Sequence, residues 1–186
     1  MAKLIYGVNS SLDGYISDTT GNFEWTTPTD EVFAFINDVE RSVGTYLLGR
    51  RMYETMLFWE TAHTLVDAPP VVQDYTRLWQ GADKIVYSTT LDAPSSARTR
   101  LEREFDPVAI RELKRTSERD VTVAGPGLAA HALRAGLVDE LQLFVVPILI
   151  GGCTRALPDV VRQSLELVSE RRFESGTIYL NYRVVH

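Results

Sequence analysis

Two adjacent arginines, Arg50 and Arg51, stand at the predicted start of a helix, directly after Gly49. The first N–H groups of a helix are unpaired and carry a partial positive charge, so two arginines there are unfavourable unless an anion binds. A phosphate group would accept charge-assisted hydrogen bonds from them, and Gly49 would let the backbone approach it closely. The alternative interpretation is an ion pair between one arginine and Glu54, one turn later.

Two further loops could hold phosphate groups, although each has a plain structural alternative. Gly125-Pro126-Gly127 stands between a predicted strand and a predicted helix. Small residues at such a junction suit a pyrophosphate at the helix N-terminus, but they equally suit an ordinary tight turn. Ser88 and Thr89 follow another predicted strand, where their hydroxyl groups could bind phosphate or simply form a turn.

The segment Trp25–Asp30 is the candidate for the substrate side of a site. A carboxylate just inside a helix and beside an indole ring could bind an amidine-like edge of a heterocycle, and burial would raise its pKa and permit proton transfer. Asp30 could instead complete a capping box with Thr27 and have only a structural role. Phe58 and Trp59 could line the substrate cleft, or belong to the core or to a dimer interface.

Alternating strands and helices are predicted to position these residues. Apolar spacing predicts helices at 30–43, 50–60, 71–80, 106–115 and 128–135, with Thr27, Pro28 and Asp30 at the cap, first and third positions of the first helix. Short apolar runs predict strands at 3–9, 45–49, 84–88, 120–124 and 140–150, and a closing hairpin of 165–174 and 177–185. This order is typical of a three-layer α/β fold, with helices on both faces of a mixed, mostly parallel sheet and a C-terminal antiparallel hairpin. We expect a single domain over 1–186, with ligands bound beyond the carboxyl ends of its parallel strands.

Composition limits the classes of function. The formal net charge is −6 and no basic run exists, which disfavours nucleic acid or an anionic membrane as a partner. The longest apolar run, 143–152, contains Pro147 and is too short to span a bilayer, and no signal peptide is recognised. The single cysteine, Cys153, favours a cytoplasmic location and is expected to be buried. The three histidines lie near no cysteine or carboxylate motif, so no metal site is predicted.

The chain resembles the dihydrofolate reductase superfamily. More closely, it is similar to bacterial proteins built on the reductase domain of the riboflavin-biosynthesis deaminase/reductase, the RibD C-terminal domain. The resemblance extends from Lys3 to Val185. It depends on five segments: Ser11-Leu12-Asp13-Gly14-Tyr15-Ile16, Leu48-Gly49-Arg50-Arg51-Met52-Tyr53-Glu54, Val123 to Gly127, Ala135-Gly136-Leu137-Val138-Asp139-Glu140-Leu141, and Pro147-Ile148-Leu149-Ile150-Gly151-Gly152.

The resemblance implies an NADPH-dependent oxidoreductase that transfers a hydride to a small heterocyclic substrate, pterin-, pyrimidine- or flavin-like. Trp25, Pro28 and Asp30 match the tryptophan, proline and acidic residue of bacterial dihydrofolate reductases, which would make Asp30 the substrate-binding acid. The implied cofactor residues fall into three groups: Gly49, Arg50, Arg51 and Met52 at the adenosine and its phosphates, with Ser88 and Thr89 close to the 2′-phosphate; Gly125, Pro126, Gly127 and Leu128 at the pyrophosphate; and Val8, Asn9 and Ile16 beside the nicotinamide.

Two alternative functions stay open on the same fold. Met52 stands where the family often has a threonine, Ala124 stands where a Gly-Gly pair is usual, and Pro126 removes a backbone donor. These departures would suit a module that binds a nucleotide or pterin without catalysis. The other alternative, 5-amino-6-(5-phosphoribosylamino)uracil reductase of riboflavin biosynthesis, needs a basic pocket for a ribityl phosphate beyond Arg50 and Arg51.

We also expect a homodimer. The apolar strand predicted at 141–150 and the final hairpin would leave a hydrophobic sheet edge exposed. A second copy of the chain could cover that edge through a two-fold interface.

Overall fold

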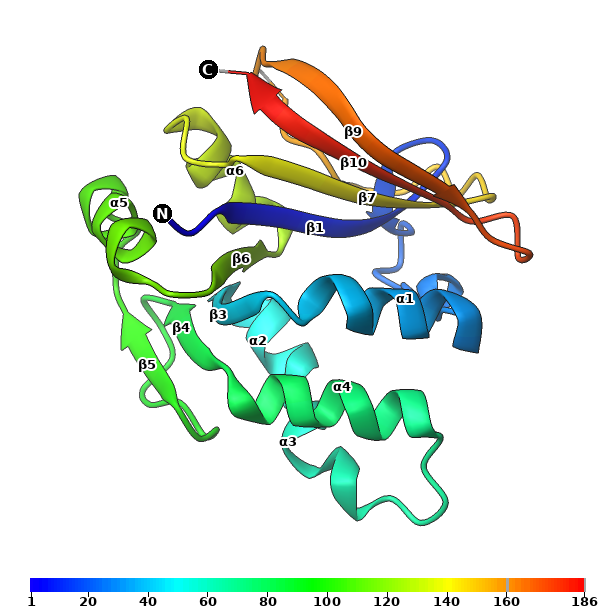
Figure 1. The fold of residues 1–186 in the computed structure, drawn as a ribbon, viewed down its shortest axis with the longest axis horizontal. Coiled ribbons are helices and arrows are strands. Elements are labelled where there is room, and N and C mark those ends of the chain that lie inside the picture. The colour runs from blue at the N-terminus through cyan, green and yellow to red at the C-terminus, as the bar shows by residue number, and fades with distance from the viewer. Residues whose placement is uncertain (160, 186) are drawn as a thin grey trace.

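An eight-stranded sheet forms the middle layer of the computed structural model, which describes residues 1–159 and 161–185 (Figure 1). Its strands are β1 (Leu4–Ser11), β3 (Val43–Gly49), β4 (Asp83–Tyr87), β5 (Thr99–Glu102), β6 (Asp120–Ala124), β7 (Glu140–Val146), β9 (Ser164–Arg172) and β10 (Ile178–Val185). They are ordered β5-β4-β3-β6-β1-β7-β10-β9. The first six in this order are parallel, whereas β10 runs antiparallel to both β7 and β9. The predicted mixed, mostly parallel sheet with a C-terminal antiparallel hairpin is therefore confirmed.

Helices α1 (Asp30–Glu40), α2 (Arg50–Met56) and α4 (Pro70–Gly81) cover one face of the sheet. Side chains of a strand alternate between the two faces, so Tyr46 and Leu48 of β3 lie on this face while Leu47 points to the other. The buried cluster under α2 and α4 consists of Val43, Tyr46, Leu48, Tyr53, Tyr75, Trp79, Ala82 and Val86. A smaller cluster under α1 contains Val32, Phe144, Phe173 and Tyr179.

Helices α5 (Pro107–Thr116) and α6 (Pro126–Arg134) cover the opposite face. Helix α5 begins where the sequence predicts it, because the Asp106 side chain accepts a hydrogen bond from the Val108 N–H (2.8 Å) and Pro107 occupies the first helical position. Ile110 of α5 packs in one cluster with Leu128 and Leu133 of α6 and with side chains of the parallel strands. Helices on both faces explain why these strands read as continuous apolar runs.

A second, two-stranded sheet joins β2 (Tyr15–Ser17) to β8 (Thr154–Arg155), at one end of the large sheet. Asp13, in the turn before β2, accepts hydrogen bonds from the Ile150 and Gly151 N–H groups (3.2 and 2.8 Å). A hydrogen bond from Ser11 and these backbone N–H groups hold the pKa of Asp13 below its usual range. A Cβ atom at Gly152 would lie 2.0 Å from the Ser17 carbonyl oxygen, so a glycine is required there. Two of the family-like segments, 11–16 and 147–152, thus hold each other in place.

Several element boundaries differ from the predictions. Helix α1 begins at Asp30 with Thr29 as N-cap, and ends at Glu40 rather than 43. Helix α2 ends at Met56 and is followed by α3 (Phe58–Thr61); short 3-10 helices η1 (Glu24–Thr26) and η2 (Ala62–Thr64) form in segments without a predicted element. Segment 89–104, for which no helix or strand was predicted, contains β5. The strand predicted at 140–150 ends at Val146 and lies inside the sheet between β1 and β10, so it is not the exposed edge that motivated the expected homodimer.

Candidate functional site

A cavity of about 780 Å³ lies at the carboxyl ends of β1, β3 and β6, between these strands and helices α1, α2 and α6. This volume is within the range of about 300–1,000 Å³ that is usual for small-molecule and cofactor sites. Eleven of the thirteen residues expected at the cofactor line it, and Ser88 and Thr89 do not. The eleven are Val8, Asn9, Ile16, Gly49, Arg50, Arg51, Met52, Gly125, Pro126, Gly127 and Leu128.

Two helices begin side by side at this cavity. Gly49 is the N-cap of α2 and Gly125 is the N-cap of α6, at the ends of the neighbouring strands β3 and β6. Gly125 has a φ of +92°, and a Cβ atom built there would lie 3.5 Å from the Met52 Cβ atom. The unpaired N–H groups of both first turns point to the same region, although Pro126 contributes none. Such a pair of helix ends can bind a polyanion such as a pyrophosphate.

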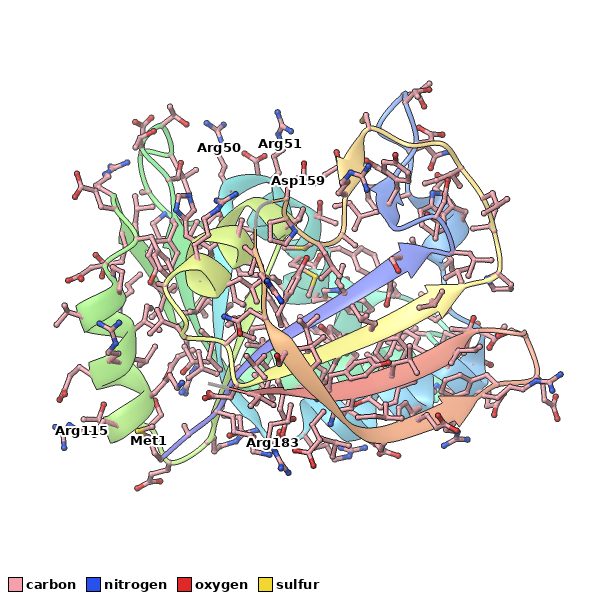
Figure 2. The ribbon with its side chains drawn as sticks, turned by 90° about the horizontal axis from the view of Figure 1, so that it is seen from above. Met1, Arg50, Arg51, Arg115, Asp159 and Arg183 are labelled. Atoms are coloured by element: carbon pink, nitrogen blue, oxygen red, sulfur yellow. The ribbon has the colours of Figure 1, made fainter. Side chains whose placement is uncertain are left out.

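The two arginines extend outward together at one end of the molecule (Figure 2). Arg50 forms an ion pair with Glu54 (2.8 Å) and also donates a hydrogen bond to the Thr90 hydroxyl (2.6 Å). The ion pair considered as an alternative is therefore present for Arg50. Arg51 is exposed and has no ion-pair partner within the described ranges. Both arginines line the cavity. Because Arg50 is paired with Glu54, Arg51 is the more available of the two to bind an anion.

Ser88 and Thr89 lie outside the cavity. The Ser88 side-chain oxygen accepts hydrogen bonds from the backbone N–H groups of Thr90 and Leu91 (3.2 and 3.0 Å). Its hydroxyl therefore stabilises the turn after β4, which is the structural alternative noted for this pair. Thr89 is exposed beside it. Contact of either residue with a 2′-phosphate stays a prediction.

The other end of the cavity has an open floor on the central strand. Val8 and Asn9 of β1 and Ile16 of β2 line this end. A Cβ atom at Gly7 would have no heavy atom within 4 Å, so the missing side chain leaves space above the strand. A flat ring could lie there against backbone and small side chains.

Trp25 and Pro28 line a second, smaller cavity of about 150 Å³, which shares Asn9, Thr26 and Phe144 with the large one. Asp30 is exposed and lines neither cavity. The capping-box interpretation is wrong, because Thr29 rather than Thr27 is the N-cap of α1 and no side-chain capping hydrogen bond forms there. The role of Asp30 as a substrate-binding acid stays a prediction, and its exposed position does not support it.

Phe58 and Trp59 also lie outside both cavities. The Trp59 ring packs against the rings of Tyr75 (4.6 Å between centroids) and Phe33 (5.8 Å), beside the core cluster under α4. The core alternative therefore describes Trp59. Phe58 packs edge-on against Trp59 and is half-exposed, so its assignment to the substrate cleft gains no support from its position.

The inner end of the cavity is formed by polar residues that are not among the sequence-based candidates. Glu40 of α1 and Gln142 of β7 line it, and Glu40 Oε2 accepts a hydrogen bond from the Tyr46 hydroxyl (2.8 Å). A signal for Glu40 exists in the sequence. Val32, Ile36 and Glu40 are spaced four apart, so the carboxylate falls on the apolar stripe of the helix.

Burial controls the charge of this inner end. Burial raises the pKa of Glu40 to about 7, although the hydrogen bond from Tyr46 lowers it in part. Burial and the nearby Glu40 raise the pKa values of Tyr46 and Tyr75, so both phenols stay neutral at physiological pH. The cavity therefore contains a carboxyl group that can be charged or neutral near pH 7, a property that is common in functional sites.

The expectation that Cys153 is buried is wrong. Its side chain is exposed rather than buried, it lines the cavity, and its sulfur lies 3.3 Å from the Asp18 carbonyl oxygen. The preceding Gly151-Gly152 segment packs against β2 and so brings Cys153 to the rim of the cavity instead of the core.

Within the described residues, no group of three or more His, Cys, Asp or Glu side chains is placed to bind a metal ion. The helices of the described chain are too short or too polar to cross a bilayer.

Comparison with known proteins agrees with this architecture. The model of the RibD C-terminal domain family matches residues 2–179. The uncharacterized protein YyaP of Bacillus subtilis (strain 168) is 24% identical over 194 residues, which cover 97% of this chain and 94% of the relative. A putative riboflavin biosynthesis protein from Shewanella sp. PV-4 has a similar structure, with a TM-score of 0.74, 20% identity and 100% of both chains covered. Dihydrofolate reductase from Enterococcus faecalis, solved with NADP(H) and RAB-propyl, superposes with a TM-score of 0.62 at 16% identity, covering 98% of this chain and 96% of that one. The predicted dihydrofolate-reductase-like fold is confirmed.

Proposed function

Because this chain belongs to the RibD C-terminal domain family, we propose that it is an NADPH-dependent reductase that transfers a hydride to a small heterocyclic substrate. One observation supports this most: eleven residues drawn from distant parts of the chain, each expected at the cofactor, line a single cavity at the carboxyl ends of parallel strands. We expect the protein to act in the cytoplasm, where its one cysteine would stay reduced.

The residues of the cavity suit a dinucleotide. The first turns of α2 and α6 and the free guanidinium of Arg51 would hold the phosphates, with Gly49 and Gly125 allowing close approach of the backbone. Asn9 and Ile16 would hold the nicotinamide beside the space left by Gly7, which stays free for the substrate. When bound, NADPH supplies the hydride, and the chain contributes position and electrostatics. Helix α1 would shield the substrate from water and hold it against the sheet.

The charges in the cavity bear on the riboflavin-biosynthesis alternative. The charged residues that line it, within the described chain, are Glu40, Arg50 and Arg51. If NADPH occupies both arginines, no basic residue is left at the inner end for a substrate phosphate. This favours an unphosphorylated substrate over 5-amino-6-(5-phosphoribosylamino)uracil. A binding module without turnover is the second candidate, and Pro126, at the first helical position of α6, favours it because one donor to the pyrophosphate is missing.

Titration with NADPH, followed by the fluorescence of the cofactor, tests the proposal. We expect saturable binding that Arg51→Ala weakens about tenfold, since a charge-assisted hydrogen bond to phosphate is lost. Arg115→Ala is the matched control, because Arg115 is exposed at the far end of the molecule and pairs with Glu112 (Figure 2). No binding at millimolar NADPH would refute the proposal. Binding without NADPH oxidation across pterins, flavins and pyrimidines would favour the binding module.

A further inference from the structure

We propose that Glu40, with Tyr46 beside it, is the substrate-binding carboxylate of this cavity, and that it binds a heterocycle edge with two adjacent N–H donors, as in a 2-amino-4-oxopyrimidine ring. This inference rests on the proposed function, because it names the substrate class for the same cavity. It places the substrate at the last residue of α1 rather than at Asp30, its first.

The position of Glu40 turns its side chain toward the sheet. Val32 and Ile36 precede it at intervals of four, and both pack against core clusters under α1. The Tyr46 hydroxyl comes up from β3 and donates to Glu40 Oε2 at 2.8 Å. Tyr75 of α4 lines the same part of the cavity. Helix α1 and the tyrosine of β3 therefore fix the carboxyl group at the inner end, with the Tyr75 phenol of α4 close enough that, besides burial, Glu40 raises its pKa.

This carboxyl group has no basic partner among the described residues. Arg41, the next residue, pairs instead with Asp38 (3.3 Å) and Asp74 (2.6 Å). Arg119 donates to the Arg41 carbonyl oxygen (2.7 Å). One Glu40 oxygen accepts from the tyrosine, and no hydrogen bond to Oε1 forms from residues 1–159 or 161–185. An acceptor oxygen left free at the end of a cavity is suited to the N–H donors of a ligand.

The sheet beneath adds a polar group and space. Gln142 of β7 is 8% exposed and lines the cavity, and its amide forms no hydrogen bond within the described part of the chain. Gly7 lies opposite Gln142 in the register of β1 and β7, with open space above it. A planar ring could lie there, with its donors toward Glu40 and its other polar atoms toward the amide, which can donate or accept.

The same groups discriminate between ring types. A flavin ring and the imide edge of uracil present one N–H between two carbonyl oxygens, and those oxygens would face the carboxylate of Glu40 unfavourably. The N1–H of free uracil has only a carbonyl oxygen and a C–H beside it, so uracil has no edge with two adjacent N–H donors. A 2-amino-4-oxopyrimidine edge presents the ring N–H and the amino group side by side and can satisfy a carboxylate with two hydrogen bonds. A phosphate ester at this end would meet a negative charge and, among residues 1–159 and 161–185, no cation.

Ionisation of Glu40 gives the binding a pH dependence. Burial raises the pKa of Glu40 to about 7, so its charge develops between pH 6 and 8. The other titratable groups nearby keep their charge in this interval: Tyr46 and Tyr75 stay neutral because burial raises their pKa values, Arg41 stays cationic because Asp74 raises its pKa, and Asp74 stays ionised because Arg41 lowers its pKa. Binding of a neutral donor edge should strengthen as the pH rises.

The experiment compares two rings of similar size, 2-amino-4-oxopyrimidine (isocytosine) and uracil, by ligand-observed NMR. We expect wild-type protein to prefer isocytosine about tenfold, since one charged hydrogen bond of this kind is worth about that factor. Glu40→Gln should lose the preference. Asp38→Asn, an exposed carboxylate on the same helix, should keep it. Between pH 6 and pH 8 the preference should grow in the wild type and stay constant in Glu40→Gln.

NADPH titration of each variant separates this inference from the proposed function. If Glu40→Gln binds NADPH normally and keeps the isocytosine preference, the inference is overturned; a wild type with no preference overturns it as well. If no variant binds NADPH but the preference still depends on Glu40, the reductase proposal fails and the inference stands. Should Glu40→Gln not fold, the wild-type pH dependence decides, and a constant preference from pH 6 to 8 overturns the inference.

Discussion

Glu40 and Asp30 are both acidic residues of α1, but only Glu40 lines the cavity, so residue type alone does not decide which of them can bind a ligand. They are the last and first residues of α1, so about 15 Å of helix separates them, at 1.5 Å per residue. An acidic residue of this helix was expected at the substrate, and the one that faces the cavity is Glu40. Which of the two is turned inward depends on where the helix begins and on how it lies against the sheet.

Ionisation of Glu40 should weaken the folded state. Burial raises its pKa from the usual 4.5 to about 7, so the folded protein binds more protons than the unfolded chain between these values. Stability from this group is therefore fully present below about pH 4.5 and is lost as the pH rises through 7. Glu40→Gln removes this titration while keeping an acceptor for the Tyr46 hydroxyl.

We expect the Tm of Glu40→Gln to exceed that of the wild type by about 5 °C at pH 8 and to approach it at pH 5. Thermal unfolding followed by circular dichroism at both pH values measures this difference. Asp38→Asn, whose carboxylate is exposed, should show no such pH-dependent gain. A constant difference between Glu40→Gln and the wild type across this interval would contradict the raised pKa.

Glycines at the junctions between strands and helices were the cavity residues most readily predicted from the sequence. Gly49, Gly125 and Gly127, expected at the cofactor, line the cavity, because a glycine between a strand and a helix has a local meaning; their contact with a cofactor stays a prediction. Ser88 looked equally suitable, but its hydroxyl is used by the adjacent turn. Gln142 and Tyr46 reach the cavity only through sheet pairing and alternation, which no local motif records.

At the level of elements, the two glycines of the α6 start have different roles. Gly125 has a φ of +92°, where a side chain is strained, and it lies close to Met52 at the start of α2. Gly127, inside α6, has no heavy atom within 4 Å of a Cβ position and lines the cavity. Gly125 is therefore needed for the fold of the junction, and Gly127 for the space in front of it.

Alanine substitutions should separate these roles. Gly125→Ala should lower the free energy of unfolding by roughly 1–3 kcal/mol, because L-residues rarely adopt a backbone at φ +92° and ψ +126°. Gly127→Ala should leave stability unchanged or raise it by up to about 1 kcal/mol, because alanine favours a helix. Its methyl group should still weaken NADPH binding. Urea unfolding and NADPH titration of both variants measure the two effects, and equal destabilisation by both substitutions would contradict the distinction.

Element types were predictable and several boundaries were not. Helix α5 was placed correctly because its cap, Asp106, and Pro107 act within one turn. The N-cap of α1 was misplaced at Thr27 because Thr27, Pro28 and Asp30 suit a cap in type, whereas Glu24–Thr26 form η1 and Thr29 is the N-cap. Strand β5 was missed because it is a short edge strand with few buried side chains, stabilised mainly by pairing with β4.

For the whole molecule, the order of strands decides where the cavity lies. The alternation of strands and helices predicted a mostly parallel sheet, but the order β3-β6-β1-β7 is a long-range property. That order places the carboxyl ends of β3 and β6 next to each other. It also places β1 and β7, which form the floor of the cavity, beside them. The same order buries the apolar strand β7 and leaves β9 at the edge, which moves the expected dimer surface from one strand to another.

The final prediction concerns this edge. Strand β9 is exposed along its whole length and includes Leu165, Leu167 and Val168, which are 43%, 48% and 46% exposed. Unpaired backbone groups beside apolar side chains favour pairing with a second copy through a two-fold interface. We expect a dimeric mass by light scattering at micromolar concentration, and a shift toward monomer in Leu167→Lys, because a charge placed in the interface must be desolvated. Val108→Lys, at an apolar residue on α5 that is 67% exposed, should stay dimeric. A monomeric wild type would refute the dimer, and a dimeric Leu167→Lys would place the interface away from β9.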